Sequence, residues 1–395
     1  MAGALIVDAL RTAGGARNGS LSGWHPADLL ARCLTALVER NRLDPARVDD
    51  VIVGCATQAG AQSVNLGRSA VLAAGWPESV PATTVDRQGA SSQQAVHFAA
   101  QGVAAGAYDV AVAAGVEVMS LVPTGAAMGR GFGQPFGPSV AARYAGRGGL
   151  VPEGIAAELM AEHWRLERAE LDAYGLRSQE RAAGATAEGR FAAEVLVVPG
   201  RQRGPDGQVL DLGRPLTVDE GIHPTTAEAL AQLRPAFQPG GRITAGNSSQ
   251  ISDGASACLV MSEAAAERLG CRPRARVVGW ALAGVDPITM LSGPAPATRA
   301  VLGRCGLALG SIDRFEVHEA FAVVVLAWAR ELGADLDRVN VNGGAIALGH
   351  PLGSSGTRAL ATLVHELERS GGRYGLQATG AGGGLANALV VECLG

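Results

Sequence analysis

Residues 340–356 read NVNGGAIALGHPLGSSG, with five glycines around a single histidine, His350. Because glycine has no side chain, it lets the backbone approach a bound molecule closely. Pro351 fixes the direction in which the chain leaves the histidine. A histidine on its own is more often structural than catalytic, but this glycine-rich setting favours a functional site at His350.

Three further segments place small and polar residues at the expected ends of strands. Residues 318–322 read HEAFA and lack the second histidine of the zinc motif H-E-x-x-H, so we expect no metal there. Residues 86–95 read DRQGASSQQA and join a strand to a helix, where free N–H groups favour negative charge. Residues 378–384 read ATGAGGG, which is typical of a backbone that approaches a ligand.

The rest of the chain predicts an α/β fold. Short runs of Val, Ile and Ala, each followed by a helical pattern, indicate buried strands at 4–8, 51–54, 110–114, 276–280, 315–317 and 388–392. Strands that alternate with helices predict α/β layers with largely parallel sheets. Between 121 and 242 the spacing becomes irregular, which predicts loops at 129–137 and 201–213 and a helical stretch at 155–186. We expect two similar α/β units around an inserted loop-rich region.

Composition excludes several classes of protein. The 395 residues predict two or three domains at roughly 150 residues each. The net charge of -4 provides no basic field for a nucleic acid, and the chain contains no lysine, which rules out Schiff-base chemistry. The six cysteines form no C-x-x-C pair, which argues against a zinc site or disulfide framework. We expect a soluble, cytoplasmic protein without a membrane span.

Together the four glycine- and histidine-containing segments resemble the thiolase family, and the resemblance extends over nearly the whole chain. The thiolase histidine motif matches residues 343–351, and residues 243–255, ITAGNSSQISDGA, look like the thiolase segment beside bound coenzyme A. The resemblance implies two βαβαβαββ halves in a layered αβαβα core, and homodimers or homotetramers. The implied units are an N-terminal half at 1–120 plus 250–271, an inserted loop domain at 121–249, and a C-terminal half at 272–395.

The chain departs from this family at both catalytic cysteines. Thiolases use one cysteine to carry the acyl group and a second to move the α-proton, and the matching positions here are Gly89 and Gly380. The resemblance implies that His350 and His318 polarise the thioester carbonyl. It also implies that Gly89 and Gly382 supply backbone N–H groups to a second oxyanion hole. Many thiolases have asparagine where this chain has His318.

These residues predict a protein that binds an acyl-CoA, or an acyl thioester on a carrier, with no covalently bound cofactor. The pantetheine arm is expected to pass Ser249, and Phe321 to line the reacting end. The chemistry would form or break C–C bonds through a thioester enolate without a cysteine acyl-enzyme, as in Claisen, retro-aldol or decarboxylation reactions. Alternatively, the protein is a non-catalytic thiolase homologue that serves as an acyl-CoA-binding or regulatory subunit of an active partner.

Several details stay open in the sequence. Ser91 and Thr379 are candidate substitutes for the lost cysteines, but a hydroxyl nucleophile needs a base nearby. The space left by the two missing side chains either admits a bulkier substrate or a water molecule, or it reflects drift at a site that is no longer under chemical demand. Arg201, Arg203 and Arg214 are candidates for contact with the coenzyme's phosphates, although a solvated loop is the preferred interpretation.

Overall fold

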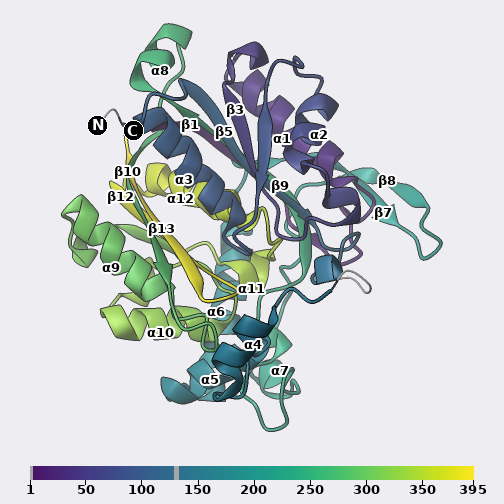
Figure 1. Ribbon diagram of the computed structural model, residues 1–395, viewed down its shortest axis with the longest axis vertical. Coiled ribbons are helices and arrows are strands. Elements are labelled where there is room, and N and C mark those ends of the chain that lie inside the picture. The colour runs from purple at the N-terminus through teal and green to yellow at the C-terminus, as the bar shows by residue number, and fades with distance from the viewer. Residues whose placement is uncertain (1–2, 129–132) are drawn as a thin grey trace.

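The computed structural model describes residues 3–128 and 133–395. Its strands form one large sheet and a separate hairpin, and helices cover the sheet on both faces (Figure 1). The strands are β1 (Leu5–Thr12), β2 (Gly15–Ala16), β3 (Asp50–Gly54), β4 (Ala82–Val85), β5 (Val110–Val118), β6 (Val195–Leu196), β7 (Val198–Arg203), β8 (Val209–Leu216), β9 (Ser252–Met261), β10 (Ala275–Gly284), β11 (Arg314–Val317), β12 (Tyr374–Ala381) and β13 (Leu385–Cys393). The helices are α1 (Pro26–Arg40), α2 (Leu66–Ala73), α3 (Ser91–Ala104), α4 (Pro138–Ala145), α5 (Glu153–His163), α6 (Arg168–Ala187), α7 (Ala227–Ala231), α8 (Glu263–Leu269), α9 (Pro294–Cys305), α10 (Ala322–Leu332), α11 (Ala345–Leu348) and α12 (Ser355–Ser370).

Two halves of the large sheet repeat the same strand order. The first half runs β1-β9-β5-β3-β4, and the second runs β10-β13-β12-β11. In the second half Val339 forms an isolated parallel bridge to Phe315 of β11, at the place that β4 occupies beside β3. The halves join where β1 pairs with β10 through Leu5 and Ile6. The expected duplication is therefore present, and all six runs of Val, Ile and Ala overlap strands.

The expectation of largely parallel sheets is wrong. The ladders of β9 with β1 and β5, of β13 with β10 and β12, and of β1 with β10 are antiparallel. Apart from isolated bridges, parallel pairing in the described residues is confined to β3 with its neighbours, β11 with β12, and a short contact of β6 with β1. β9 is buried along its whole length, so it lacks the alternation of polar and apolar residues that marks a half-exposed antiparallel strand.

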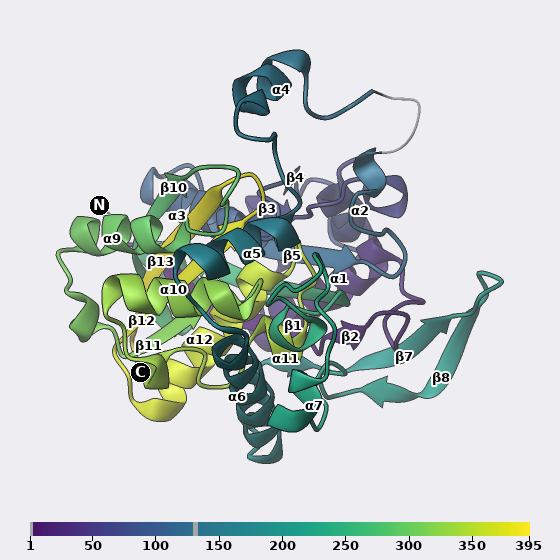
Figure 2. The same ribbon diagram turned by 90° about the horizontal axis from the view of Figure 1, so that it is seen from below.

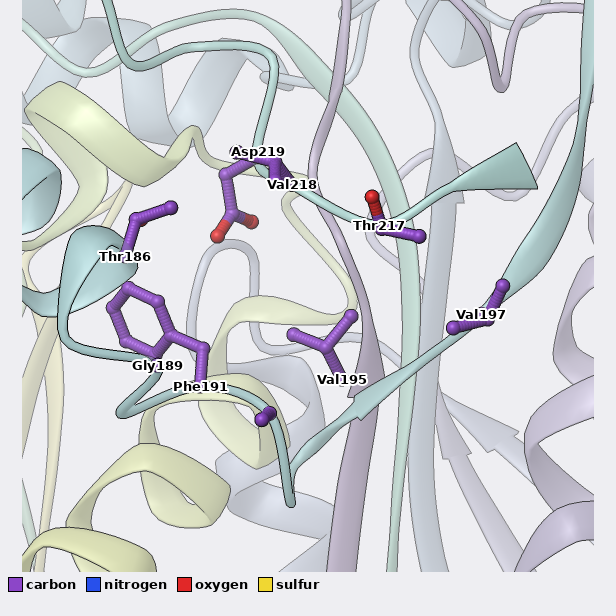
Figure 3. Close-up of a pocket in the computed structure, with 9 residues that line it drawn as sticks. Thr186, Gly189, Phe191, Val195, Val197, Thr217, Val218 and Asp219 are labelled. Atoms are coloured by element: carbon purple, nitrogen blue, oxygen red, sulfur yellow. The ribbon is translucent and has the colours of Figure 1, made fainter. Parts of the chain in front are cut away.

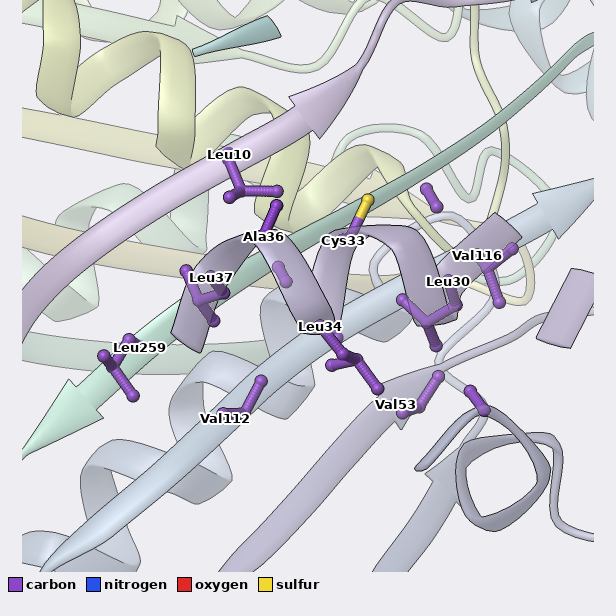
Figure 4. Close-up of a cluster of buried hydrophobic side chains, with 14 of the residues drawn as sticks. Leu10, Leu30, Cys33, Leu34, Ala36, Leu37, Val53, Val112, Val116 and Leu259 are labelled. Atoms are coloured by element: carbon purple, nitrogen blue, oxygen red, sulfur yellow. The ribbon is translucent and has the colours of Figure 1, made fainter. Parts of the chain in front are cut away.

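The fold has five layers, and three apolar cores pack them together. In the first core, α1 and α2 pack on the outer face of the N-terminal half-sheet. Figure 4 shows Leu30, Leu34 and Leu37 of α1, at helical spacing, directed at strand residues that include Val112 and Leu259. The central core holds α3 and α12 between the two half-sheets, and α9 and α10 cover the outer face of the C-terminal half. The layered αβαβα core is confirmed.

The inserted region differs from its prediction in two places. The helical stretch expected at 155–186 is two helices, α5 and α6, with a break at which Arg165 has a φ of 51°. The loop expected at 201–213 is part of the β7–β8 hairpin, which extends away from the body of the molecule (Figure 2). Because most of β8 is exposed, the hairpin sequence shows no alternation of polar and apolar residues. Of the loop expected at 129–137, residues 129–132 lie outside the described residues, and no helix or strand covers 133–137.

The hairpin is held at its base by the segment before α1. The backbone N–H of Arg201 donates to the carbonyl of Ser20 at 2.7 Å, and the indole of Trp24 donates to the carbonyl of Pro199 at 2.9 Å. The guanidinium of Arg201 lies over the Trp24 ring, 4.1 Å from its centroid. Arg201 therefore has a structural contact that the sequence does not reveal.

Candidate active site

Two histidines from different loops meet at the centre of the candidate site. His318 directly follows β11, and its backbone N–H donates to the carbonyl of Ala378 at 2.9 Å. His350 follows α11, and its backbone N–H donates to the carbonyl of Gln250 at 3.0 Å. The Nε2 atoms of the two imidazoles are 3.2 Å apart, and each histidine is 8% exposed. Both imidazoles are therefore buried.

The hydrogen bonds of Ser355 define which nitrogen of His350 is basic. The Ser355 hydroxyl donates to the carbonyl of Pro351 at 2.9 Å, and its oxygen lies 2.6 Å from Nδ1 of His350. Since the hydroxyl proton of Ser355 is already used in that bond, its oxygen accepts a hydrogen bond from the Nδ1–H of His350. The lone pair of His350 then lies on Nε2, where the Nε2–H of His318 donates to it. The basic atom of the pair is therefore Nε2 of His350.

Both imidazoles are held in their neutral form. Burial, with a smaller effect of the Arg358 charge, lowers the pKa of His318 to about 3. Burial lowers the pKa of His350 well below its ordinary value, and His318 and Arg358 add to this effect. The pKa values fall because a charged imidazolium would lose its hydration here and would be repelled by the positive guanidinium of Arg358. At neutral pH the two imidazoles are therefore uncharged, and their Nε2 atoms form one hydrogen bond with each other.

The turn at Gly89 lies directly against His350. The Cβ of a side chain at position 89 would lie 3.1 Å from both Nε2 and Cε1 of His350, and the next atom is the carbonyl oxygen of Gly380 at 3.9 Å. Gly89 does not have the positive φ that favours glycine. At position 353, by contrast, an added Cβ would lie 2.6 Å from the carbonyl oxygen of Gly54, so the fold requires glycine there. No such requirement acts on Gly89.

Gly380 and Gly382 complete the floor of the site. A Cβ on Gly380 would lie 3.2 Å from Cγ of Pro294, and Gly380 has an ordinary negative φ, so glycine is not sterically required there either. A Cβ on Gly382 would lie 3.7 Å from the Gln88 side chain, which places this turn beside that of Gly89. Within residues 3–128 and 133–395, the N–H groups of Gly89 and Gly382 donate to no acceptor. Two free donors therefore lie on adjacent turns.

Neither proposed hydroxyl substitute is placed as a nucleophile beside His350. The Ser91 hydroxyl donates to the carbonyl of Gln88 at 2.6 Å and accepts from the N–H of Arg87 at 2.9 Å, so it stabilises its own turn. Thr379 is buried within β12 and pairs with Asn387 of β13. The hydrogen bonds of His350 go to Ser355 and His318 instead.

The predicted coenzyme-side residues lie next to the histidine segments. The backbone N–H of Ser249 donates to the carbonyl of Ala320 at 3.0 Å, which pairs Ser249 with the residues that follow His318. The buried ring of Phe321 meets the half-exposed ring of Phe237 edge-on at a centroid distance of 5.9 Å. An aromatic pair thus adjoins the segment that carries Ser249.

A groove of about 320 Å³ runs beside the same segment. Gln250 lines this groove, and its carbonyl is the acceptor for the backbone N–H of His350. Its side-chain amide donates to the carbonyls of Gly221 and Ile346 at 2.8 Å, which connects the inserted region to the histidine loop. The other residues that line the groove include His223, Ala229, Leu230, Leu233, Ala245 and Gly246.

The sequence analysis missed the residue that holds the two histidine loops together. The buried carboxylate of Glu319 accepts from Tyr174 and Ser178 of α6 at 2.8 Å, and from the Asn340 amide and the Ile346 N–H at 3.0 Å. The sequence shows a glutamate after His318, but its charge gave no indication that four donors surround it. Glu319 is a positioning residue because it contacts the loops and not the reacting space.

A second cavity, of about 270 Å³, contains none of the predicted site residues. Figure 3 shows the Asp219 carboxylate and the Phe191 ring at its wall. That carboxylate is already paired, because Asp219 accepts from Arg11 at 2.7 Å and from the Gly14 N–H at 2.7 Å. The other residues that line it are Thr186, Gly189, Ala192, Val195, Val197, Thr217 and Val218.

The fold and the site define a class of protein: two repeated α/β halves that bring two loop histidines against glycine turns. Comparison with known proteins gives the family. The model described as "Thiolase, N-terminal domain" matches residues 4–264, and "Thiolase, C-terminal domain" matches residues 271–393. The chain belongs to the thiolase family.

Characterised relatives are similar over their whole length. Steroid 3-ketoacyl-CoA thiolase FadA6 of Mycobacterium tuberculosis is 47% identical, and the match covers 100% of this chain and 95% of the relative. The β-ketoadipyl-CoA thiolase of Pseudomonas aeruginosa is 45% identical, with 98% of each covered. The crystal structure of Bacillus anthracis acetyl-CoA acetyltransferase is similar with a TM-score of 0.89 at 36% identity, covering 100% of this chain and 99% of that one.

The human mitochondrial 3-ketoacyl-CoA thiolase is also similar in structure, with a TM-score of 0.87 at 35% identity and 99% of each chain covered. Across the described ranges 3–128 and 133–395, no helix is both long and apolar enough to cross a membrane.

Proposed function

We propose that the protein binds an acyl-CoA, or an acyl thioester on a carrier, and converts it to an enolate without forming a cysteine acyl-enzyme. The enolate then takes part in forming or breaking a C–C bond. The observation that carries this proposal is the neutral histidine pair, 3.2 Å apart, beside two free backbone N–H groups. Enolate chemistry needs a base and hydrogen-bond donors. The chain has both, although it lacks the two catalytic cysteines.

The ligand class rests on the groove and on the relatives. The groove of about 320 Å³ is lined by Gln250, which follows Ser249 in the chain and whose carbonyl accepts from the backbone N–H of His350. The relatives are named as thiolases of CoA thioesters, among them 3-ketoacyl-CoA and β-ketoadipyl-CoA. We infer the same thioester class here, with Phe321 beside the reacting end.

The proposed chemistry assigns one task to each polar group. The bound thioester replaces the hydrogen bond between the two imidazoles: Nε2 of His350 then accepts the α-proton of the thioester, and the Nε2–H of His318 donates to the oxygen on which the enolate charge develops. The N–H groups of Gly89 and Gly382 hold the carbonyl oxygen of the reaction partner. Because the imidazole of His350 becomes charged when it takes the proton, the nearby enolate stabilises it until the proton returns or a C–C bond forms.

The test is α-proton exchange. The purified protein is incubated with acetyl-CoA and longer acyl-CoAs in heavy water, and deuterium uptake is followed by mass spectrometry. We expect uptake that falls by at least about a hundredfold in His350→Ala, the size of a general-base contribution, while coenzyme A affinity stays within about twofold. His365→Ala is the matched control, since His365 bonds to the carbonyl of Ala361 within α12 and lies outside the site.

The outcomes separate the two candidate functions. Exchange that survives unchanged in His350→Ala would refute the histidine assignment. Absence of exchange despite measurable coenzyme A binding would refute the enzymatic proposal and favour a regulatory or binding subunit. A search for an active partner subunit would then follow.

Restoring both cysteines tests whether Gly89 and Gly380 correspond to the two catalytic cysteines of the family. We expect Gly89→Cys with Gly380→Cys to gain acetoacetyl-CoA cleavage, since the neighbours of the added Cβ atoms, His350 at 3.1 Å and Pro294 at 3.2 Å, need to shift only slightly and both positions have ordinary φ angles. The measurement is coenzyme-A-dependent loss of the acetoacetyl-CoA absorbance. If the folded double variant binds coenzyme A but gains no cleavage, the positions do not correspond to the family's two cysteines.

A further inference from the structure

Glu117 is a buried glutamate that the proposed chemistry does not use. It is the penultimate residue of β5 and is fully buried. Its carboxylate accepts from the backbone N–H groups of Ala56 and Gly353 at 2.9 Å. It also accepts from the Thr57 N–H at 3.0 Å and from the Gln62 amide at 2.6 Å. Four N–H donors therefore surround one carboxylate.

The charged form of Glu117 is the one that fits these contacts. Oε2 accepts from Ala56 and Gly353. Oε1 accepts from Thr57 and Gln62. Burial raises the pKa of Glu117, and its four N–H partners act in the opposite direction. A proton on either oxygen would point at donors and find no acceptor, and an amide in place of the carboxylate would have the same fault.

The bond to Gly353 joins the two halves of the molecule at the histidine loop. Glu117 belongs to the first half, whereas Gly353 belongs to the second and follows His350 by three residues. On the other side of His350, the Ile346 N–H donates to the carboxylate of Glu319 at 3.0 Å. One buried carboxylate from each half therefore holds the loop, one before His350 and one after it.

The same contact lies against the start of α3, directly after the turn of Gly89. A Cβ added to Gly115 of β5 would lie 2.6 Å from the Cβ of Ser92, and it would also collide with the carbonyl of Gly353. The backbones of β5, α3 and the histidine loop therefore meet closely here. Glu117 is bonded to the loop at this meeting point.

We propose that Glu117 is a positioning residue for the proposed reaction: by holding Gly353, it fixes His350 against the turn of Gly89. The inference rests on the proposed function, because it aligns the base of the second half with the backbone N–H donor of the first. Both groups would act on the same bound substrate. A misplacement of about 1 Å between such groups can cost about a hundredfold in rate.

Three variants test the role of the carboxylate. Glu117→Gln keeps the shape of the side chain, but its NH2 group faces two N–H donors. The double variant Glu117→Gln with Gln62→Glu gives that NH2 group an acceptor, so the amide oxygen is free to face Gly353. Asp49→Asn is the matched control, because the Asp49 carboxylate also accepts from two backbone N–H groups, at the start of the same strand.

The first measurement is the rate of deuterium exchange on acetyl-CoA, followed over a range of concentrations together with coenzyme A affinity. We expect kcat to fall at least about tenfold in Glu117→Gln, while coenzyme A affinity changes by less than about twofold. The double variant should return to within about threefold of the natural rate, since it regains the acceptor for Gly353. Asp49→Asn should exchange at the natural rate.

The second measurement does not depend on catalysis. Labelling the seven histidines with nitrogen-15 gives ring signals by NMR, and the signals of His350 are those that disappear in His350→Ala. We expect one fixed tautomer of His350 in the natural chain, with its proton on Nδ1 facing Ser355. In Glu117→Gln the loosened loop should average the two tautomers.

A folded Glu117→Gln variant with the natural exchange rate and an unchanged His350 signal would overturn the proposal. A rate that the folded double variant does not recover would do the same. Should Glu117→Gln fail to fold, Glu117→Asp withdraws the carboxylate by one methylene group, and the same two losses are expected.

The two proposals fail separately. If the natural chain exchanges no α-proton, the proposed function is removed, but averaging of the His350 tautomers in Glu117→Gln still supports the positioning role. Exchange in the natural chain that is equally fast in Glu117→Gln would leave the enolate proposal standing and remove this one.

Discussion

At the scale of single residues, Gly89 and Gly353 lie near the same histidine but are glycines for different reasons. A side chain at 353 would collide with the backbone at Gly54, whereas one at 89 meets only the edge of His350 at 3.1 Å. The substitutions therefore have different costs. Replacing Gly353 disturbs the packing between the halves, while replacing Gly89 changes the chemistry and leaves the fold intact.

Ser355 offers a prediction at the same scale. Ser355→Ala removes the acceptor for Nδ1 of His350, so the imidazole loses the bond that fixes its tautomer and orientation. One hydrogen bond of this kind contributes about 1 kcal/mol, so we expect deuterium exchange to slow by roughly fivefold with little change in coenzyme A affinity. Ser355→Thr should recover most of the rate. An unchanged rate in Ser355→Ala would show that the loop alone orients His350.

The motifs predicted His350 and His318, and the structure brings them together. The dependence of His350 on Ser355 could not be read from the sequence, because their five-residue spacing matches no helical contact and the turn at Pro351 creates it. Glu319 was missed for a similar reason. Its donors come from α6, far away in the chain, and only the folded inserted region brings them near.

At the scale of elements, α3 carries an unusual buried histidine in the central layer. His97 is fully buried, and neither ring nitrogen has a hydrogen-bond partner in the part of the chain that the structure describes. Burial, with a small effect of Arg87, lowers the pKa of His97 to about 3. In the unfolded chain the ordinary pKa is about 6.5. The folded state therefore binds fewer protons than the unfolded state between these two values.

The sign of the pH effect follows from this difference. Stability from a neutral His97 is fully present above about pH 6.5 and is lost progressively as pH falls toward 3. His97→Leu removes this titration. We expect the variant to gain about 2 kcal/mol relative to the natural chain between pH 7.5 and pH 5, measured by urea unfolding at both values. An equal pH dependence in the two proteins would show that His97 is protonated in the folded state.

The elements themselves were only partly predictable. Runs of buried apolar residues located β1, β3, β5, β10, β11 and β13, but the fully buried β9 was not among the predicted strands. The break between α5 and α6 was not predicted either, because the residue with the left-handed φ is Arg165 and not a glycine. Local composition specifies that an element forms, while its partners set its direction and its ends.

At the scale of the whole molecule, the two halves share one central layer. The core between the half-sheets combines residues of α3 with residues of α12, and the sheets themselves join only where β1 meets β10. We expect one cooperative unfolding transition in urea, with fluorescence of the five tryptophans and far-UV circular dichroism giving the same midpoint. Two separated transitions would show that the halves are stable apart from each other.

The site belongs to neither half alone. Gly89 begins the approach to α3 in the first half, whereas His318, His350 and Gly380 all belong to the second. During synthesis the ribosome delivers the turn of Gly89 long before the strand that carries Gly380. The proposed thioester chemistry therefore cannot begin on the growing chain until the second half has docked, and this activity would report the completion of folding as directly as any structural probe.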